Sequence, residues 1–416
     1  MTTKRLFGSV LALLCVSQLA NQADDWPQWR GPHRDGISQE KGLLKEWPKE
    51  GPKQSWAAKN LGSGYSTPAV VGSTLYLLGN EGLENESIKA LSVDKGETLW
   101  STRLGKVGNP NQKPAYPGAR STATVDGDLI YALGSDGDLV CLDKSGKVKW
   151  QKNVRSEFGG QPGTWAYSES PLVDGNAVAV TPGGAEATMV ALNKKTGEVI
   201  WKSGIPGGEQ AAYSSIVTTE VGGKKQYVQF LQKGVVGVDA KSGAFLWRYD
   251  RPAQGSPANI PTPVVFGNYV FASTGRGGGG LIKLNADGAK IEPEPVYHEM
   301  KVPTAIGGAV KIGDYLYGTS KGLLCLEFMT GKQKWEEEKI GAASLCFADG
   351  RLYLHGENGE VALVEATPEG YHEKGRFTPA DAPSRGPSKA WSYPVVANGR
   401  LYIFDTGTLY CYDIKQ

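Results

Sequence analysis

The sequence predicts an all-β fold, an eight-bladed β-propeller of four-stranded antiparallel blades closed by pairing N-terminal and C-terminal strands. The first observation is a recurring unit that ends on tryptophan, seen in 134–150 as GSDGDLVCLDKSGKVKW. The second is its spacing: the closing tryptophans follow one another at 44 to 51 residues, with one gap of 88 that fits two units. A period of about 40–50 residues is typical of propeller blades. The closing tryptophans are Trp56, Trp100, Trp150, Trp201, Trp247 and Trp335.

Each unit also contains a hairpin upstream of its tryptophan. Examples are PAVVGSTLY (68–76), ATVDGDLIY (123–131) and PVVANGRLY (394–402). Gly, Asn or Asp stands between two alternating apolar runs, which is the pattern of a tight β-hairpin. Together with the turn before the tryptophan, this gives four short strands per unit. Seven units begin near residues 66, 120, 168, 213, 260, 307 and 342, and the eighth begins at 391.

The two ends of the repeat array complement each other. The eighth unit contains only three strand patterns before the sequence ends, whereas 52–59 (PKQSWAAK) carries a repeat-type tryptophan with no strands before it. An open ring would leave an unpaired strand edge at each end. We therefore expect the segment around Trp56 to pair with the strand at 409–413.

The N-terminal 23 residues have the features of a secretory signal. Lys4 and Arg5 precede an apolar run from Leu6 to Ala20, which is too short for a membrane span. The sequence therefore predicts a secreted or periplasmic protein with no transmembrane span in the mature chain. No lipobox precedes Cys15, so a lipid anchor is not expected.

The charge balance of the chain bears on its class of partner. Without residues 1–23 the chain carries 43 basic and 43 acidic residues, and this balance does not favour a nucleic-acid partner.

Residues 24–51 precede the propeller (52–416) and are expected to form a strap whose Trp26, Trp29 and Trp47 cover apolar blade surface. A functional arm is the alternative. We expect a monomer.

Two unusually long links predict where a site lies. The links 101–120 and 151–169 join consecutive units, and long loops in compact folds are commonly functional. In a four-stranded blade such links emerge at the same end of the ring as the middle hairpin. One face, here called the long-loop face, is therefore elaborated and should hold the site.

Polar and aromatic residues stand just before or at the innermost strands and should ring the mouth of the central channel. Glu169 and Asn259 are residue types that a Ca²⁺ site would need, and Arg120 can hold a carboxylate with both terminal nitrogens. The alternative is that these groups bond one another and water to seal a polar channel. The candidate ligand-binding residues are Tyr65, Arg120, Trp165, Tyr167, Glu169, Tyr213, Asn259, Lys389 and Trp391.

The turn-plus-tryptophan motif resembles the tryptophan-docking repeat of pyrroloquinoline-quinone (PQQ)-type propellers. The best matches are 141–150, 191–201, 238–247 and 325–335, and the resemblance covers about residues 52–416. In that superfamily each tryptophan packs between neighbouring blades, so the six closing tryptophans would be structural docking residues.

The resemblance implies two functions. The leading hypothesis is a non-catalytic extracytoplasmic scaffold similar to BamB-type outer-membrane assembly factors, binding a protein or small ligand on the long-loop face, with no cofactor. The alternative is a minimal quinoprotein that oxidises an alcohol or sugar with PQQ and Ca²⁺, in which Glu169 and Asn259 would be the metal ligands. Quinoprotein dehydrogenases usually carry a vicinal disulfide, and this sequence has no adjacent cysteines. No segment matches their catalytic Asp motif, so no catalytic residue is predicted.

Overall fold

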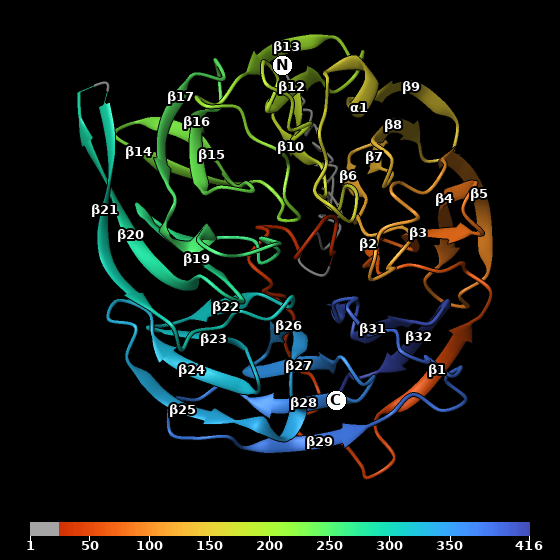
Figure 1. Cartoon of the computed structure of the whole chain (residues 1–416). Helices are drawn as coiled ribbons and strands as arrows, with labels where there is room; N and C mark the ends of the chain where they lie inside the picture. The colour runs from red at the N-terminus through yellow and green to blue at the C-terminus, as the bar shows by residue number, and fades with distance from the viewer. Residues whose placement is uncertain (1–24, 289) are drawn as a thin grey trace, which may run out of the picture.

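The computed structural model describes residues 25–288 and 290–416, and within them eight four-stranded antiparallel sheets surround a central axis (Figure 1). The predicted fold class is confirmed. The predicted signal segment, residues 1–23, lies outside the described residues. Within those residues, no helix has the length and apolar character that crossing a membrane requires.

The first four blades follow one another along the chain. Blade 1 contains β2 (Ala69–Val71), β3 (Thr74–Glu81), β4 (Asn85–Ser92) and β5 (Thr98–Gly105). Blade 2 contains β6 (Thr124–Asp126), β7 (Leu129–Leu133), β8 (Asp138–Asp143) and β9 (Val148–Asn153). Blade 3 contains β10 (Leu172–Asp174), β11 (Ala177–Val180), β12 (Met189–Asn193) and β13 (Val199–Ser203). Blade 4 contains β14 (Val217–Val221), β15 (Lys224–Phe230), β16 (Val235–Asp239) and β17 (Phe245–Tyr249).

The other four blades complete the ring. Blade 5 contains β18 (Val264–Phe266), β19 (Tyr269–Thr274), β20 (Gly278–Asp287) and β21 (Lys290–Glu299). Blade 6 contains β22 (Ala309–Ile312), β23 (Tyr315–Thr319), β24 (Leu323–Glu327) and β25 (Gln333–Glu337). Blade 7 contains β26 (Ala343–Ala348), β27 (Arg351–Gly356), β28 (Val361–Glu365) and β29 (Glu373–Phe377). Blade 8 contains β30 (Val395–Ala397), β31 (Arg400–Asp405), β32 (Thr408–Asp413) and β1 (Lys53–Ala58). Among the described residues, three short helical turns, α1 (Val154–Glu157), η2 (Arg251–Ala253) and η3 (Glu338–Ile340), lie in links between blades.

The ring closes as predicted. Strand β1 pairs antiparallel with β32, so that Trp56 lies opposite Cys411 and Ala58 opposite Leu409. Both strands gain a hydrogen-bonded neighbour, which removes the free edge that each would otherwise expose. The eighth blade is thus built from both ends of the repeat array.

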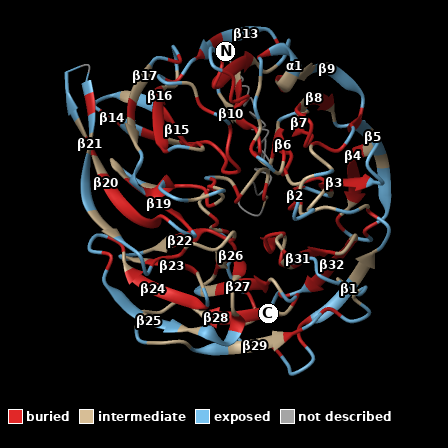
Figure 2. Cartoon of the chain, viewed as in Figure 1, coloured by how far each residue is buried: buried red, intermediate tan, exposed pale blue. Residues whose placement is uncertain are grey.

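The apolar core is divided into layers between neighbouring blades. One such layer joins Leu78 and Ile88 of blade 1 to Ile130 and Val140 of blade 2, all fully buried. The two middle strands of the blades are largely buried, whereas the outermost strands are exposed on one side (Figure 2). This is the alternation expected of antiparallel sheets that face water at the rim.

Hydroxyl groups link the blades around the channel. The backbone N–H of Thr122 donates to Ser170 Oγ (2.9 Å), and that of Ser170 donates to Ser215 Oγ (3.0 Å). The N–H of Ser215 donates in turn to Thr262 Oγ1 (3.3 Å). These bonds pair backbone N–H groups at the narrow centre of the ring, so the inner strands can approach one another there.

Five of the six predicted docking tryptophans reach the next blade. Each indole Nε1 donates to a carbonyl in or beside the outer turn of the following blade, at 2.9 to 3.2 Å. The pairs are Trp56 with Val93, Trp100 with Lys144, Trp150 with Lys194, Trp201 with Ala240, and Trp335 with Thr367. Trp247 instead donates to Gln226 of its own blade (2.7 Å). That these contacts hold the ring together stays a prediction.

Two blades lack the tryptophan at this register position. In blade 5 the position opposite Leu281 is Tyr297, whose hydroxyl donates to Phe328 O (3.0 Å) in the next blade. In blade 7 the corresponding residue is Gly375, opposite Leu363. A Cβ added to Gly375 would lie 2.5 Å from Cβ of Trp47. The strap therefore supplies the indole that blade 7 lacks.

The strap crosses the face opposite the long loops, here called the short-turn face because it carries the tight turns within each blade. Trp26 pairs with Val70 of blade 1 and Ile37 with Phe347 of blade 7, while Arg34 reaches Pro171 beside blade 3. Figure 1 shows this red segment running through the centre of the ring. The axial channel is consequently closed on one side.

Candidate functional site

An aromatic pocket lies on the axis at the long-loop face, above the strap. It encloses about 210 Å³. Its walls come from the links that precede the inner strands and from one strap residue. The lining residues are Trp29, Tyr65, Tyr116, Arg120, Trp165, Ser168, Tyr213, Ala258, Ile260, Ile306, Trp391 and Tyr393. We call this cavity the axial pocket.

Five of the nine sequence-predicted candidates come together here. Tyr65 and Trp391 have ring centroids 5.0 Å apart, and Trp165 lies 6.0 Å from Tyr213. Arg120 completes this group, with its guanidinium carbon 5.8 Å from the Tyr65 ring centroid. These residues share a sequence position just before an inner strand or in a long link, which is why the sequence could indicate them.

The other four candidates lie outside the axial pocket. The buried Tyr167 donates its hydroxyl proton to Pro182 O (2.8 Å). Asn259 is fully buried and donates from Nδ2 to the carbonyl oxygens of Leu231 (2.7 Å) and Gln232 (3.0 Å). Lys389 is half-exposed and forms an ion pair with Glu357 at 3.4 Å.

Glu169, the fourth, is a buried interblade carboxyl group. Its oxygens accept hydrogen bonds from Thr181 N (2.6 Å), Thr181 Oγ1 (3.0 Å) and Gln229 Nε2 (3.1 Å). Burial raises the pKa of this carboxyl to about 8, although the hydrogen bonds from Thr181 oppose the shift.

This raised pKa predicts how stability depends on pH. The folded protein keeps the proton on Glu169 up to about pH 8, whereas the unfolded chain releases it near the ordinary pKa of 4.5. The folded state therefore binds more protons in this window, and the free energy of unfolding contributed by Glu169 should fall as the pH rises through it. Urea denaturation at several pH values, with Glu169→Gln as the comparison, measures this. We expect a shallower decline in Glu169→Gln; identical declines would contradict the assignment.

Sequence reasoning missed several residues of the axial pocket. Trp29 donates from Nε1 to Thr262 Oγ1 (3.1 Å), and its ring meets Tyr393 edge-on at 4.5 Å. Tyr116, in the first long link, meets the Trp391 ring at 4.8 Å. Trp29 was expected to cover blade surface, but it lines the pocket, while Trp26 and Trp47 are buried as expected. The tryptophan-rich composition of the strap was the available signal.

Arg120 supplies the positive charge of the pocket. Its guanidinium donates to the carbonyl oxygens of Gly118 (3.3 Å) and Tyr116. Burial lowers the pKa of Arg120, opposed by Tyr65 and by the more distant Glu86. No carboxylate of the described residues lies within ion-pair distance of it. A guanidinium surrounded by aromatic rings and lacking a carboxylate partner is well suited to hold an anionic group.

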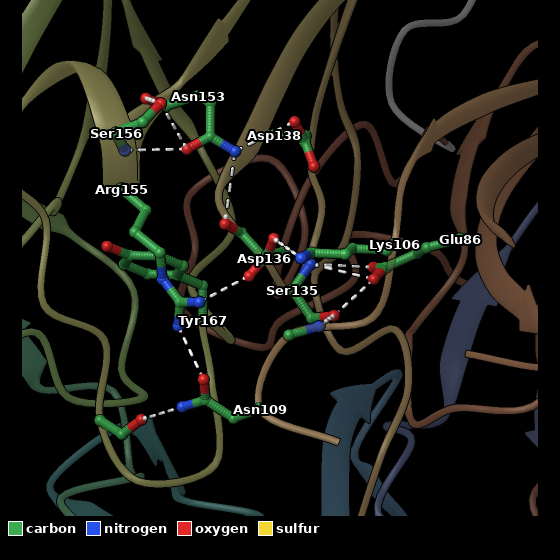
Figure 3. Close-up of polar contacts among 12 residues, drawn as sticks. Glu86, Lys106, Asn109, Ser135, Asp136, Asp138, Asn153, Arg155, Ser156 and Tyr167 are labelled. Carbon is green, nitrogen blue, oxygen red and sulfur yellow. Dashed lines mark hydrogen bonds and ion pairs between the residues drawn. The ribbon is translucent and has the colours of Figure 1, made fainter. Parts of the chain in front are cut away.

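A polar network fixes the loops that carry the pocket (Figure 3). Arg155 donates from Nη1 to Asp136 (2.7 Å) and from Nη2 to Asn109 (2.8 Å). Asn109 then donates to the carbonyl oxygens of Gly163 (3.3 Å) and Thr164 (3.2 Å), directly before Trp165. The first long link is thus tied to the second, and both loops are held in one arrangement.

The same network is anchored in blade 1 by Glu86. This buried carboxylate accepts from the backbone N–H and the hydroxyl of Ser135, the latter at 2.5 Å (Figure 3). Ser135 Oγ in turn accepts from the N–H of Gly108 in the first long link (2.9 Å). The pocket walls therefore rest on hydrogen bonds to two rigid blades, which limits the reorganisation that binding would require.

The predicted Ca²⁺ ligands do not form a cation site. The lining of the axial pocket contains no carboxylate, and its one charged group is the cation Arg120. Glu169 and Asn259 are engaged elsewhere, as described above. Among residues 25–288 and 290–416, no three His, Cys, Asp or Glu side chains gather as metal ligands. The donor set therefore does not match the oxygen-rich coordination that Ca²⁺ requires.

Comparison with known proteins identifies relatives. The family model described as outer membrane protein assembly factor BamB matches residues 37–161 and 84–337. An outer membrane protein assembly factor BamB of Burkholderia pseudomallei is 25% identical over 321 residues, covering 63% of this chain and 75% of that protein. A 1-butanol dehydrogenase (quinone) of Thauera butanivorans is 28% identical, covering 30% of this chain and 20% of that protein. The chain thus spans only a fifth of that dehydrogenase.

A solved structure shares the fold. The crystal structure of BamB from Moraxella catarrhalis superposes with a TM-score of 0.63 at 13% identity, covering 87% of this chain and 100% of that one. At this identity the likeness establishes the propeller fold and nothing further.

Proposed function

Because this chain belongs to the family described as outer membrane protein assembly factor BamB, among the PQQ-like repeat β-propellers, we propose that it is a non-catalytic extracytoplasmic binding propeller. Its long-loop face engages a partner protein or a small ligand. The relatives named for outer-membrane assembly and the predicted signal segment support a location outside the cytoplasm.

The axial pocket is the observation that carries this proposal. Seven aromatic side chains and one arginine converge on it from the strap and from links between blades. Aromatic rings bury large apolar area at low entropic cost, and they are frequent at binding sites for this reason. A purely structural channel seal would not need an arginine that lacks a carboxylate.

The chemistry of the pocket indicates what it binds. Stacked and edge-on rings favour a flat or ring-shaped apolar body, and Arg120 favours a carboxylate or another oxyanion attached to it. The volume of about 210 Å³ accommodates a single ring system or one anchoring side chain of a partner. The proposed occupant is therefore an anionic group joined to one apolar ring.

Matched probe ligands test this assignment. Calorimetric titration with benzoate and with benzyl alcohol compares an anionic with a neutral ring of similar size. We expect benzoate to bind more tightly than benzyl alcohol, and Arg120→Gln to remove about 1.5–3 kcal/mol of that preference, because one charged hydrogen-bond donor is lost. Arg276→Gln, an exposed arginine outside the pocket, is the control. Equal affinities for the two probes would contradict the assignment.

The quinone-dependent relatives support a second candidate, a PQQ- and Ca²⁺-dependent alcohol or sugar dehydrogenase. The pocket lining contains no carboxylate for the cation, so we derive no catalytic step from it. Incubation of the purified protein with PQQ and Ca²⁺, followed by dye-linked alcohol oxidation, tests this candidate. Substrate-dependent dye reduction would favour the enzyme. The absence of both a PQQ absorbance change and dye reduction would eliminate this candidate.

A further inference from the structure

A second cavity lies on the short-turn face, beneath the strap. It encloses about 520 Å³ and is lined by strap residues 30–37 and by the inner strands of blades 4, 5 and 6. Its charged lining residues are Arg30, His33, Arg34, Asp35, Glu220 and Lys311. We call it the strap cavity. The strap lies between this cavity and the axial pocket. Arg30, which lines the strap cavity, lies against Gly308 near the hydroxyl of Tyr393, which lines the axial pocket.

Two buried arginines of the strap, Arg30 and Arg34, line the strap cavity. Arg30 and Arg34 are 3% and 5% exposed. Arg30 donates to the carbonyl oxygens of Asp35 (2.9 Å) and Ala309. Every one of these acceptors is a neutral backbone group, and the Nε atom of Arg30 has no hydrogen-bond partner among the described residues.

Arg34 shows the same pattern. It donates to the side-chain oxygen of Gln28 (3.0 Å) and to the carbonyl oxygens of Ser170 (2.9 Å) and Pro171 (3.1 Å). Its Nε atom also has no partner within residues 25–288 and 290–416. Burial lowers the pKa of Arg34 to about 10, partly offset by the field of Glu169. Arg34 therefore remains a cation at neutral pH.

Neither guanidinium lies within 4 Å of a carboxylate oxygen in the part of the chain that the structure describes. The carboxyl group of Asp35 accepts from the N–H of Ile37 (3.0 Å), and burial raises its pKa, opposed by this hydrogen bond and by the fields of Arg30 and His33. Glu220 is exposed at the rim. Buried charges in proteins are normally paired, because desolvation without a counter-charge is costly. Two buried cations that line one cavity without an ion pair are therefore an unusual arrangement.

A third cation faces the same cavity from blade 6. Lys311 Nζ lies 3.6 Å from the ring centroid of Phe266 and donates to Gly313 O (2.6 Å). Lys311 also lacks an ion pair among the described residues, and His33 adds an exposed imidazole at the rim. Burial lowers the pKa of Lys311, opposed by the field of Asp314. Three basic side chains thus share the lining with two carboxyl groups.

We propose that the strap cavity binds a small oxyanion, free or as a phosphate monoester, between Arg30, Arg34 and Lys311. Guanidinium groups match the geometry of phosphate and carboxylate oxygens, and an ammonium group adds a compact charge. The anion would pair directly with Arg30 and Arg34, whereas Asp35 and Glu169 act on them only through their fields and form no ion pair with them. The site lies on the opposite face from the axial pocket, so it is independent of the function proposed above.

The test is calorimetric titration of the full protein with inorganic phosphate and, separately, with glycerol 3-phosphate, in buffers of matched ionic strength. We expect saturable binding with one site per chain. Lys311→Gln should weaken it about tenfold, the loss of one charge-assisted contact. Tighter binding of glycerol 3-phosphate would identify a monoester as the preferred form, and tighter binding of phosphate the free ion.

Two further variants guard against misfolding and unspecific charge effects. Arg34→Lys keeps the cation but loses the planar fork, and should also weaken binding about tenfold while retaining the wild-type circular dichroism. Lys283→Gln, a half-buried lysine on β20 outside the cavity, should bind as the wild type does. Absence of saturable binding by the wild type, or equal affinities in all variants, would overturn the proposal.

Discussion

Replacing Trp47 with alanine is expected to lower the free energy of unfolding by about 3–5 kcal/mol, the range for removing a large buried aromatic side chain. Trp47 is 7% exposed, and its ring centroid lies 5.9 Å from Tyr353 and 5.4 Å from Phe377. In blades 1, 2, 6 and 8 the blade's own tryptophan lies 6.0 to 6.2 Å from the equivalent tyrosine. Trp47 therefore packs against Tyr353 as the docking indoles pack against their tyrosines, although its Nε1 has no hydrogen-bond partner among the described residues.

Chemical denaturation monitored by circular dichroism measures this effect. Trp335→Ala, in the neighbouring blade, is the matched comparison and should cost a similar free energy, because each indole packs against the tyrosine at the same register position, Trp335 losing also its hydrogen bond to Thr367 O. Trp165→Ala removes a half-exposed indole from a loop and should cost far less. A loss below about 1 kcal/mol for Trp47→Ala would show that the strap merely lies on the ring.

An engineered disulfide between β1 and β32 is expected to stabilise the protein by about 2–4 kcal/mol. Lys53 and Asp413 are exposed cross-strand partners, so the double variant Lys53→Cys/Asp413→Cys places two thiols on paired strands far apart in sequence. Such a bond closes a very long loop, and it restricts the unfolded chain accordingly.

The measurement is thermal denaturation of the oxidised and reduced double variant, together with gel mobility to verify an intramolecular bond. The pair Lys53→Cys/Asp239→Cys, with the second thiol on blade 4, is the control and should not cross-link within one chain. Failure of Lys53→Cys/Asp413→Cys to form an intramolecular disulfide would contradict the ring closure.

The repeat could be predicted in detail because the strands and turns of each blade are specified by residues within that blade. Turn glycines, alternating apolar residues and a closing tryptophan recur at one spacing, so the eight blades and their closure follow from the sequence. The exceptions were less accessible. Nothing near Gly375 in the sequence indicates that Trp47 packs at this position, because the contact joins residues far apart in sequence.

The candidate site was predictable in part for a similar reason. Tyr65, Arg120 and Trp391 could be placed because the position before an inner strand faces the channel mouth. Along the same segments, neighbouring side chains point in other directions. Glu169 and Asn259 therefore form hydrogen bonds with Thr181 and Leu231 and do not line the pocket. The sequence reveals which segments approach the axis, but the direction of each side chain depends on the path of its link.

The strap illustrates the remaining gap. Its tryptophans were recognised as buried groups, yet nothing in their spacing distinguishes Trp29, which enters the axial pocket, from Trp26, which pairs with blade 1. That difference depends on how the segment crosses the channel, and its anchors Arg30 and Arg34 bond carbonyl oxygens of blades 6 and 3.

Site-specific photo-cross-linking compares the two faces most directly. A photoreactive residue at Tyr116, beside the axial pocket, is paired with one at Ser242, in an outer turn on the short-turn face, and both are irradiated in cells that produce the protein. We predict a discrete adduct from position 116 that weakens when Arg120→Gln is added, and none from position 242. Adducts from position 242 alone would contradict binding at the long-loop face.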